Sequence, residues 1–254
     1  MTFAQNIHIR SVYLPRVDTS LVVLPNSYAS ATNKKYPVVF MLHGFSGNYK
    51  QWQKIIDLQN YANQYQFILV CPDGLYDSWY INSPIIAKQQ YASFFFEDLY
   101  PYILKNYRAD SQHIFITGLS MGGYGAYSLF LEKPTLFKSV AATSALFDLR
   151  LFAKKFGLTK ILGNLTENTK HSWEKFAISK QIILAQENKM LANKLLFFDC
   201  GTEDVFLQSN IDLETVCKKL QISATFIRNN GQHDVAYWKK SILLHFDFFS
   251  KQVQ

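Results

Sequence analysis

Cysteine is scarce in this sequence of 254 residues. The three cysteines, Cys71, Cys200 and Cys217, are an odd number, and no two of them have a C-x-x-C spacing. This pattern suggests neither a disulfide framework nor a zinc site. Cys71 ends an apolar run without an electropositive neighbour, so we interpret it as an inert thiol and not as a nucleophile. We expect all three cysteines to be reduced thiols in the core.

Long apolar runs are also absent. Residues 1–10 contain no apolar segment of the kind that marks an export signal, and no later run approaches the length that a bilayer requires. We therefore expect a cytoplasmic protein with no membrane partner.

A continuous basic stripe is a third missing feature. The formal net charge is +7, but the lysines come in scattered pairs, at 34–35, 154–155, 218–219 and 239–240. Each pair stands beside a predicted loop or on the polar side of a helical pattern, which is typical of a solvated surface. Because no stripe with interleaved aromatic residues appears, nucleic acid is not an expected partner.

Hydrophobic and aromatic residues are abundant by contrast. They make up 48% and 16% of the chain, with 21 Phe and 15 Tyr. A chain of this length and composition can bury a large core, and no internal repeat or low-complexity tract marks a second unit. We predict a single α/β domain over residues 1–254.

Strand-like and helix-like segments alternate along most of the chain. Apolar, β-branched runs predict strands at residues 7–14, 20–24, 36–42, 67–71, 114–118, 139–142, 195–199 and 225–228. Helical periodicity predicts helices at residues 51–64, 91–107, 121–132, 207–220 and 235–249. The alternation predicts a mostly parallel sheet with helices on both faces, and the first two strands predict an antiparallel hairpin at its edge. Reactive groups are then expected at the carboxyl ends of the parallel strands.

One predicted strand leads directly into a serine flanked by glycines. Gly118, Ser120 and Gly122 form a G-x-S-x-G pattern, and a helical pattern begins at Met121. A strand, a tight turn and a helix in this order are typical of a nucleophile elbow, whose turn strains the serine backbone and leaves no room for a Cβ two positions away. We predict Ser120 as a catalytic nucleophile.

A serine hydroxyl needs a base within hydrogen-bond reach. Three histidines follow Ser120 in the sequence, namely His171, His233 and His245. His245 lies in the apolar pattern of the last predicted helix, which favours a structural histidine in the core or at the surface, and His171 lies in an irregular region. His233 directly follows a strand in a turn-rich loop, so we predict it as the base.

The base needs an acid to orient it, from the loop after the preceding strand. That loop offers Asp199, Glu203 and Asp204. Asp199 still belongs to the strand, whereas Gly201 opens a turn that can present Asp204 to the base. We favour Asp204 and keep the other two as alternatives. Asp234 is interpreted as a charge at a helix N-terminus.

Acyl transfer also requires N–H donors for a tetrahedral oxyanion. In this arrangement they come from the residue after the nucleophile and from the loop after an earlier strand. These are the backbone amides of Met121 and Phe45, and Gly44 allows close approach. His43 is predicted to orient this loop and is not expected to bind a metal, because no partner histidine stands at ligand spacing.

Two regions are candidates for contact with a substrate. Trp79 and Tyr80 lie in an irregular stretch after a strand, where open α/β sheets bind ligands. We predict that these two residues, together with His43, contribute to substrate binding. Residues 146–190 lose regular periodicity and are the best candidate for a cap-like insertion over the active site.

Five short blocks together resemble the Putative esterase family of α/β-hydrolases, which includes the S-formylglutathione hydrolases of the esterase D group, tributyrin and feruloyl esterases, and mycolyltransferases. The resemblance extends from about Val38 to Trp238 in the order of the family. The blocks are His43-Gly44-Phe45-Ser46-Gly47-Asn48 with Trp52, Asp73-Gly74 with Ser78-Trp79-Tyr80, Gly118-Leu119-Ser120-Met121-Gly122-Gly123, Gly201-Thr202-Glu203-Asp204, and Gly231-Gln232-His233-Asp234 with Tyr237-Trp238.

The resemblance implies an α/β-hydrolase fold and a triad of Ser120, His233 and Asp204, with the amides of Phe45 and Met121 as oxyanion hole and no cofactor. It implies a serine carboxylesterase whose partner is a small-molecule ester with a short acyl or small aryl group. An S-formylglutathione-type thioester hydrolase is the alternative. An acyltransferase and a non-catalytic binding module on the same fold are the less favoured alternatives. A homo-oligomer is left open, because spacing alone does not locate an interface.

Overall fold

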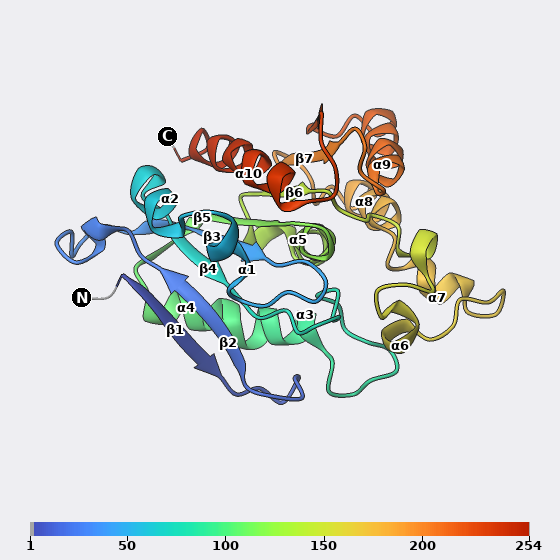
Figure 1. Ribbon diagram of the computed structural model, residues 1–254, viewed down its shortest axis with the longest axis horizontal. Helices are drawn as coiled ribbons and strands as arrows, with labels where there is room; N and C mark the ends of the chain where they lie inside the picture. Colours follow the sequence, from blue (N-terminus) through green and yellow to red (C-terminus); the bar gives the residue numbers. More distant parts are fainter. Residues whose placement is uncertain (1–2, 254) are drawn as a thin grey trace.

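The computed structural model describes residues 3–253 and has an eight-stranded sheet at its centre (Figure 1). Its strands are β1 (Ala4–Ile9), β2 (Asp18–Val23), β3 (Tyr36–Leu42), β4 (Ile68–Cys71), β5 (Ala109–Gly118), β6 (Ser139–Thr143), β7 (Leu195–Gly201) and β8 (Ala224–Asn229). Their spatial order is β1-β2-β4-β3-β5-β6-β7-β8. The pairs β1–β2 and β2–β4 are antiparallel and the other neighbours are parallel, so the predicted sheet and its edge hairpin are confirmed.

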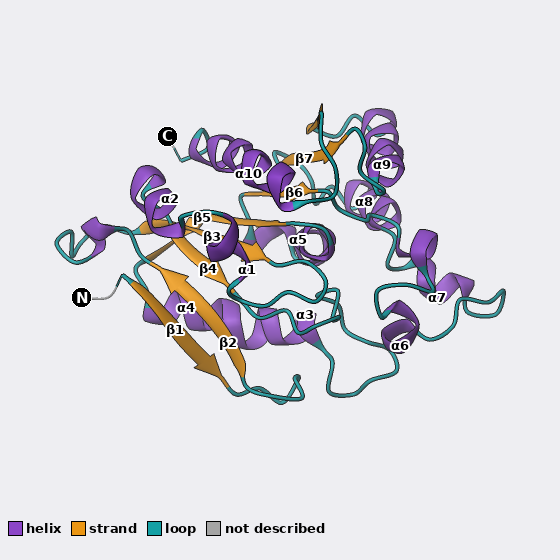
Figure 2. Cartoon of the chain, in the orientation of Figure 1, coloured by secondary structure: helices purple, strands orange, loops and turns teal. Residues whose placement is uncertain are grey.

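Helices cover both faces of this sheet (Figure 2). Those outside the segment between β6 and β7 are α1 (Gln51–Ile55), α2 (Leu58–Tyr65), α3 (Tyr91–Phe94), α4 (Tyr100–Asn106), α5 (Met121–Glu132), α9 (Leu207–Lys219) and α10 (Val235–Ser250). On one face, α1, α2 and α10 pack around a core that contains Trp52 and Phe246. On the other face, α3, α4, α5 and α9 pack around a core that contains Phe94 and Tyr127.

Strand β3 shows why helices must cover both faces of the sheet. Every residue from Tyr36 to Leu42 is buried. Because successive side chains of a strand point to opposite faces, Val39 contributes to the core under α10 and Phe40 to the core around α3 and α4. A continuous apolar run is the sequence pattern of such a doubly covered strand.

Three predicted elements were wrong in extent. β1 ends at Ile9, well before the predicted end at residue 14, and β5 begins at Ala109, well before the predicted start at residue 114. The predicted helix 51–64 is divided into α1 and α2 at Asp57, whose carboxylate caps α2 by accepting the Asn60 N–H. The predicted helix 91–107 is confirmed as one continuous helical run from Tyr91 to Asn106, in which a π-helical turn at Phe95–Leu99 lies between α3 and α4. Pro101 lies just after this irregular turn, where the regular hydrogen-bond ladder is already interrupted.

The segment between β6 and β7 contains the predicted irregular region. It holds a 3-10 turn at Leu149–Phe152, then α6 (Leu158–Leu162), α7 (Lys170–Glu174) and α8 (Ile178–Glu187). Helix α8 packs on α5, while α6 and α7 extend beyond the end of the sheet in Figure 1. That residues 1–254 form one domain with a cap-like insertion stays a prediction.

None of the helices within residues 3–253 combines the length and the apolar character that crossing a bilayer requires.

Candidate active site

Ser120 lies in the tight turn between β5 and α5. Its backbone has φ 54° and ψ −118°, a region that a residue with a side chain rarely adopts. A Cβ on Gly118 would lie 2.2 Å from the Gly122 carbonyl oxygen, and a Cβ on Gly122 would lie 2.3 Å from the Leu42 carbonyl oxygen. Both glycines are therefore required for the close packing of β5, α5 and β3 that forms the turn.

The imidazole of His233 faces the Ser120 hydroxyl. Its Nε2 lies 3.0 Å from Ser120 Oγ. The loop after β8 carries His233 to the start of α10, where the Asp234 carboxylate caps the helix by accepting the Tyr237 N–H. The packing of α10 and its cap thus fixes where His233 stands, and the prediction for Asp234 is confirmed.

The Asp204 carboxylate lies behind the imidazole. His233 Nδ1 is 2.9 Å from Asp204 Oδ2 and 3.1 Å from Oδ1. Burial opposes ionisation most strongly, but hydrogen bonds from His233 and from the Phe206 N–H outweigh it and hold the pKa of Asp204 below its ordinary value. The ionised carboxylate favours the tautomer with a proton on Nδ1, so that Nε2 can accept the Ser120 proton.

The alternative acids serve other partners. Asp199 is fully buried and lies 2.7 Å from Nε2 of His245, a buried histidine of α10. Glu203 accepts a hydrogen bond from Gln232, and His171 is exposed and paired with Glu174. Of the predicted candidates, only Ser120, His233 and Asp204 meet in one hydrogen-bonded chain.

Two backbone amides next to Ser120 remain without an acceptor. Within residues 3–253, no carbonyl or side-chain oxygen accepts a hydrogen bond from the N–H of Phe45 or of Met121. Phe45 lines the cavity above Ser120, and Met121 is the first residue of α5. First-turn amides of a helix point outward along its axis and are ready donors for an anion. Both amides are therefore available for an oxyanion.

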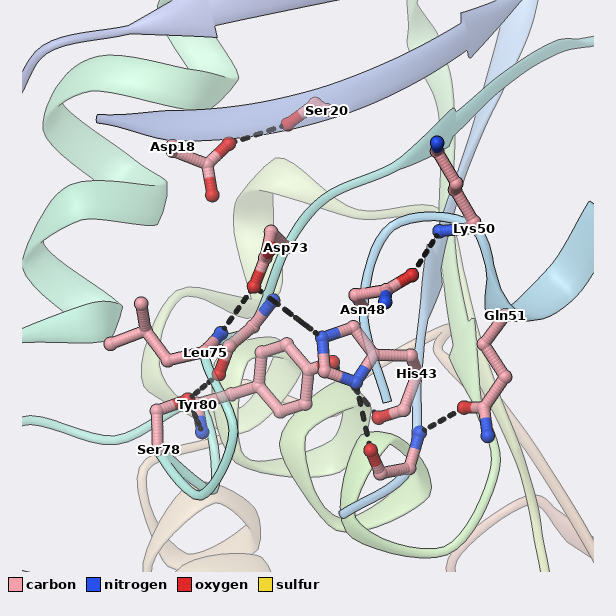
Figure 3. Close-up of polar contacts among 12 residues, drawn as sticks. Asp18, Ser20, His43, Asn48, Lys50, Gln51, Asp73, Leu75, Ser78 and Tyr80 are labelled. Carbon is pink, nitrogen blue, oxygen red and sulfur yellow. Dashed lines mark hydrogen bonds and ion pairs between the residues drawn. The ribbon is translucent and has the colours of Figure 1, made fainter. Parts of the chain in front are cut away.

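His43 holds the loop that carries Phe45 (Figure 3). Its Nε2 accepts the Gly74 N–H at 2.7 Å, so the proton must be on Nδ1, which donates to the Gly44 carbonyl at 2.8 Å. This carbonyl belongs to the same peptide group as the Phe45 N–H, and the two point in opposite directions across a trans peptide. Burial lowers the pKa of His43, which keeps the ring neutral and both hydrogen bonds intact.

Further contacts fix the same loop (Figure 3). Gln51 accepts the Gly44 N–H at 2.7 Å, and the Tyr80 hydroxyl donates to the His43 carbonyl at 2.9 Å. Asp73 accepts the Leu75 N–H at 2.9 Å and thereby shapes the turn that presents Gly74 to His43.

His43 and Tyr80 are both buried and do not line the cavity at Ser120. Substrate contact by these two residues stays a prediction, and their hydrogen bonds position the loop. His43 was also predicted to orient this loop, and the hydrogen bonds place it there.

The cavity at Ser120 is small and mostly apolar, with a volume of about 220 Å³. Its lining consists of Gly44, Phe45, Gln51, Trp79, Leu119, Ser120, Phe156, Val205, Phe206, His233 and Trp238. The rings of Phe206 and Trp238 stand edge-on to His233, with centroids 4.8 and 5.1 Å away. Trp79 was predicted from its loop. Phe156 and Phe206 were missed, because nothing in the sequence shows which way an irregular segment folds back.

Comparison with known proteins identifies the family. The family model described as "Putative esterase" matches residues 11–246. The chain belongs to this family. An acetyl esterase of Caldicellulosiruptor saccharolyticus is 25% identical to this esterase over 272 residues, which cover 96% of the chain and 97% of that relative.

Solved structures agree on the fold of this esterase. A ferulic acid esterase matches with a TM-score of 0.84 and 26% identity, covering 98% of this chain and 97% of that one. An S-formylglutathione hydrolase from Agrobacterium tumefaciens matches with a TM-score of 0.82 and 20% identity, covering 99% and 95% of the two chains. The predicted α/β-hydrolase fold is confirmed, and the protein is an ester-hydrolysing enzyme.

The cysteines take no part in this site. All three are free and buried, as predicted. Burial raises the pKa of the Cys71 thiol far above its ordinary value, so that it stays protonated. In the part of the chain that the structure describes, no three His, Cys, Asp or Glu side chains form a group that could hold a metal ion.

Proposed function

We propose that this esterase is a serine carboxylesterase that hydrolyses short-chain acyl or small aryl esters through an acyl-enzyme. The observation that carries the proposal is the hydrogen-bonded chain from Ser120 through His233 to Asp204, with distances of 3.0 and 2.9 Å. It stands at an apolar cavity that also contains Phe45, beside two amides without an acceptor.

In the first step, Ser120 Oγ attacks the ester carbonyl carbon while His233 Nε2 takes the hydroxyl proton. The carbonyl oxygen becomes an oxyanion, which accepts hydrogen bonds from the amides of Phe45 and Met121. The ionised Asp204 stabilises the imidazolium that forms.

In the second step, the bond to the alcohol breaks and His233 returns the proton to the leaving oxygen. The acyl group is then joined to Ser120 Oγ as an ester. A water molecule gives a proton to His233 and attacks this ester, which releases the acid and restores the Ser120 hydroxyl. No group outside the chain and the water is needed, so we propose an enzyme without a cofactor.

The size and lining of the cavity support small substrates. A volume of about 220 Å³ is below the roughly 300 to 1,000 Å³ that is usual for sites of drug-sized ligands. Trp79 and the other aromatic residues of the lining offer apolar contact to an acyl or aryl group. The acetyl esterase and ferulic acid esterase relatives act, by their names, on esters of these two kinds.

A thioester hydrolase is the second candidate, supported by the S-formylglutathione hydrolases among the structural matches. It would use the same three side chains and would in addition bind the carboxylates of glutathione. We also propose a cytoplasmic location, which the three free cysteines support.

A substrate panel under identical conditions tests the proposal. It contains p-nitrophenyl esters of increasing acyl length, methyl ferulate and S-formylglutathione, with Ser120→Ala as control. We expect the highest kcat/KM for the short acyl esters, and a loss on the order of a million-fold in kcat for the variant. A preference for S-formylglutathione would favour the second candidate, and a Ser120→Ala variant with near wild-type turnover would contradict both.

A further inference from the structure

The segment between β6 and β7 contributes one side chain to the cavity at Ser120. Among the residues described as lining the cavity, Phe156 alone comes from this segment. It stands directly before α6, and its ring packs against the rings of Phe45 at 5.5 Å and Trp79 at 6.5 Å between centroids. An element of irregular sequence therefore forms part of the wall around the nucleophile.

The backbone of Phe156 is held in an unfavourable conformation. Its φ is 55°, in the left-handed region that a bulky residue rarely enters, and Gly157 follows with φ 73°. The indole N–H of Trp79 donates to the Phe156 carbonyl at 3.0 Å. Lys160 forms an ion pair with the buried Asp77 at 2.8 Å and ties the start of α6 to the Trp79 loop. Strain that persists under such restraints is characteristic of functional positions.

The chemistry proposed above indicates which part of the substrate faces Phe156. His233 must give a proton to the leaving alcohol, so the alcohol lies next to the imidazole, where Phe206 and Trp238 stand edge-on to the ring. Phe156 packs on Phe45 of the oxyanion loop at 5.5 Å and also on Phe206 at 6.0 Å between centroids, while Trp79 packs on Phe156. Because the proposed reaction holds the carbonyl oxygen at the oxyanion loop, the ring that packs on this loop bounds the space open to the acyl group.

A larger hollow lies behind Phe156. It has a volume of about 640 Å³, and Phe152 and Leu151 contribute to its lining. The Phe152 ring packs on the Phe156 ring at 6.0 Å between centroids. Phe156 thus lines the small cavity at Ser120, while the tilted ring of Phe152 beside it lines the larger hollow.

We propose that Phe156 is the specificity-determining residue for acyl length. Its ring closes the acyl side of the cavity, so that short acyl groups fit and longer chains meet the ring before the carbonyl reaches Ser120. This inference rests on the proposed function, because it needs an acyl-enzyme at Ser120.

The test measures kcat/KM for p-nitrophenyl acetate, butyrate, hexanoate and octanoate. Three variants are compared with the wild type: Phe156→Ala, Phe156→Trp and, as matched control, Leu151→Ala. Leu151 is exposed, lies in the same segment and does not line the cavity. Labelling by a fluorophosphonate measures the fraction of each protein with an intact nucleophile, and rates are divided by that fraction.

We expect Phe156→Ala to raise the hexanoate-to-acetate ratio of kcat/KM by about tenfold or more, the range that a changed methylene contact in an apolar pocket gives. Phe156→Trp should lower the same ratio, and Leu151→Ala should leave it unchanged. If Phe156→Ala does not fold, the shift in Phe156→Trp decides.

An unchanged ratio in labelled Phe156 variants would overturn this inference and leave the proposed function standing. So would an equal shift in Leu151→Ala, since that points to loosening of the whole segment. A wild-type enzyme that hydrolyses none of these esters and takes no label at Ser120 would overturn the proposed function itself.

Discussion

Asp199 and Asp204 stand in one short stretch of sequence and have different partners. Asp204 is hydrogen-bonded to His233 in the candidate site. Asp199 is buried and is hydrogen-bonded instead to His245, Thr143 and Ser241. The sequence alone left both open as the acid. The difference arises at the end of β7, where the chain leaves the sheet and carries only the later carboxylate to the imidazole.

Replacing each aspartate by asparagine separates their roles. Asp204→Asn should keep its fold and lose about ten-thousand-fold in kcat, because His233 then adopts the wrong tautomer. Asp199→Asn should lose about 3 kcal/mol of unfolding free energy by breaking a buried pair, with kcat per labelled site near that of the wild type. Urea unfolding and p-nitrophenyl acetate turnover give the two quantities. Reversed outcomes would assign the acid to Asp199.

His43 offers a second test at a single side chain. His43→Ala removes the donor that fixes the Gly44 carbonyl, so the Phe45 N–H is no longer aimed. We expect kcat to fall about tenfold to a hundredfold with little change in KM, somewhat less than the loss of an oxyanion donor. His43→Asn retains an N–H near the Nδ1 position and should recover part of the rate. Equal loss in both variants, or a change in KM alone, would speak against this positioning role.

The elbow between β5 and α5 depends on contacts with another element. A Cβ on Gly122 would lie 2.3 and 2.6 Å from the carbonyl oxygens of Leu42 and His43, at the end of β3. The nucleophile turn and the oxyanion loop are thus packed against each other with no room between them. The nucleophile turn positions Ser120 and the oxyanion loop positions Phe45, so a change in the distance between turn and loop displaces both residues.

Gly122→Ala should therefore affect stability and rate together. We expect a loss of about 1 to 3 kcal/mol from overpacking and a lower kcat, because β3 and α5 must move apart. Gly163→Ala is the control, since a Cβ there meets nothing within 4 Å although its φ is 80°. It should cost about 1 to 3 kcal/mol through backbone strain, because φ 80° with ψ 178° is almost confined to glycine, and should leave kcat unchanged. A Gly122→Ala enzyme with wild-type kcat and stability would contradict the packing argument.

The stability of the whole molecule should depend on Asp18, a buried carboxyl at the start of β2. Burial raises its pKa from 3.8 to about 7, against an opposing hydrogen bond from Ser20. Within residues 3–253 its Oδ1 has no hydrogen-bond partner. A carboxyl with a raised pKa in the folded state contributes stability below its unfolded pKa, and this contribution is lost as the pH rises through about 7.

Unfolding in urea at pH 5 and pH 8 measures this effect. We expect the wild type to lose on the order of 2 kcal/mol more than Asp18→Asn over this interval. Asp212→Asn, which removes an exposed carboxylate of α9, should behave as the wild type. Parallel losses in the wild type and Asp18→Asn would show that Asp18 ionises without penalty.

Much of the fold and of the candidate site followed from local sequence. The strands of the parallel sheet were predicted because burial on both faces leaves continuous apolar runs such as β3, and Ser120 and His233 because each follows a strand in a turn of distinctive composition. The cavity wall could not be predicted in the same way. Phe156 is fixed at the site by a hydrogen bond from Trp79 to its carbonyl and by the nearby ion pair between Lys160 and Asp77, which are contacts between segments far apart in the chain.

Reaction with a fluorophosphonate, followed by peptide mapping, tests the central claim most directly. The account predicts a single covalent label on Ser120, much slower labelling of His233→Ala, and none of Ser120→Ala. A label on another residue, or equal labelling of the wild type and Ser120→Ala, would contradict it.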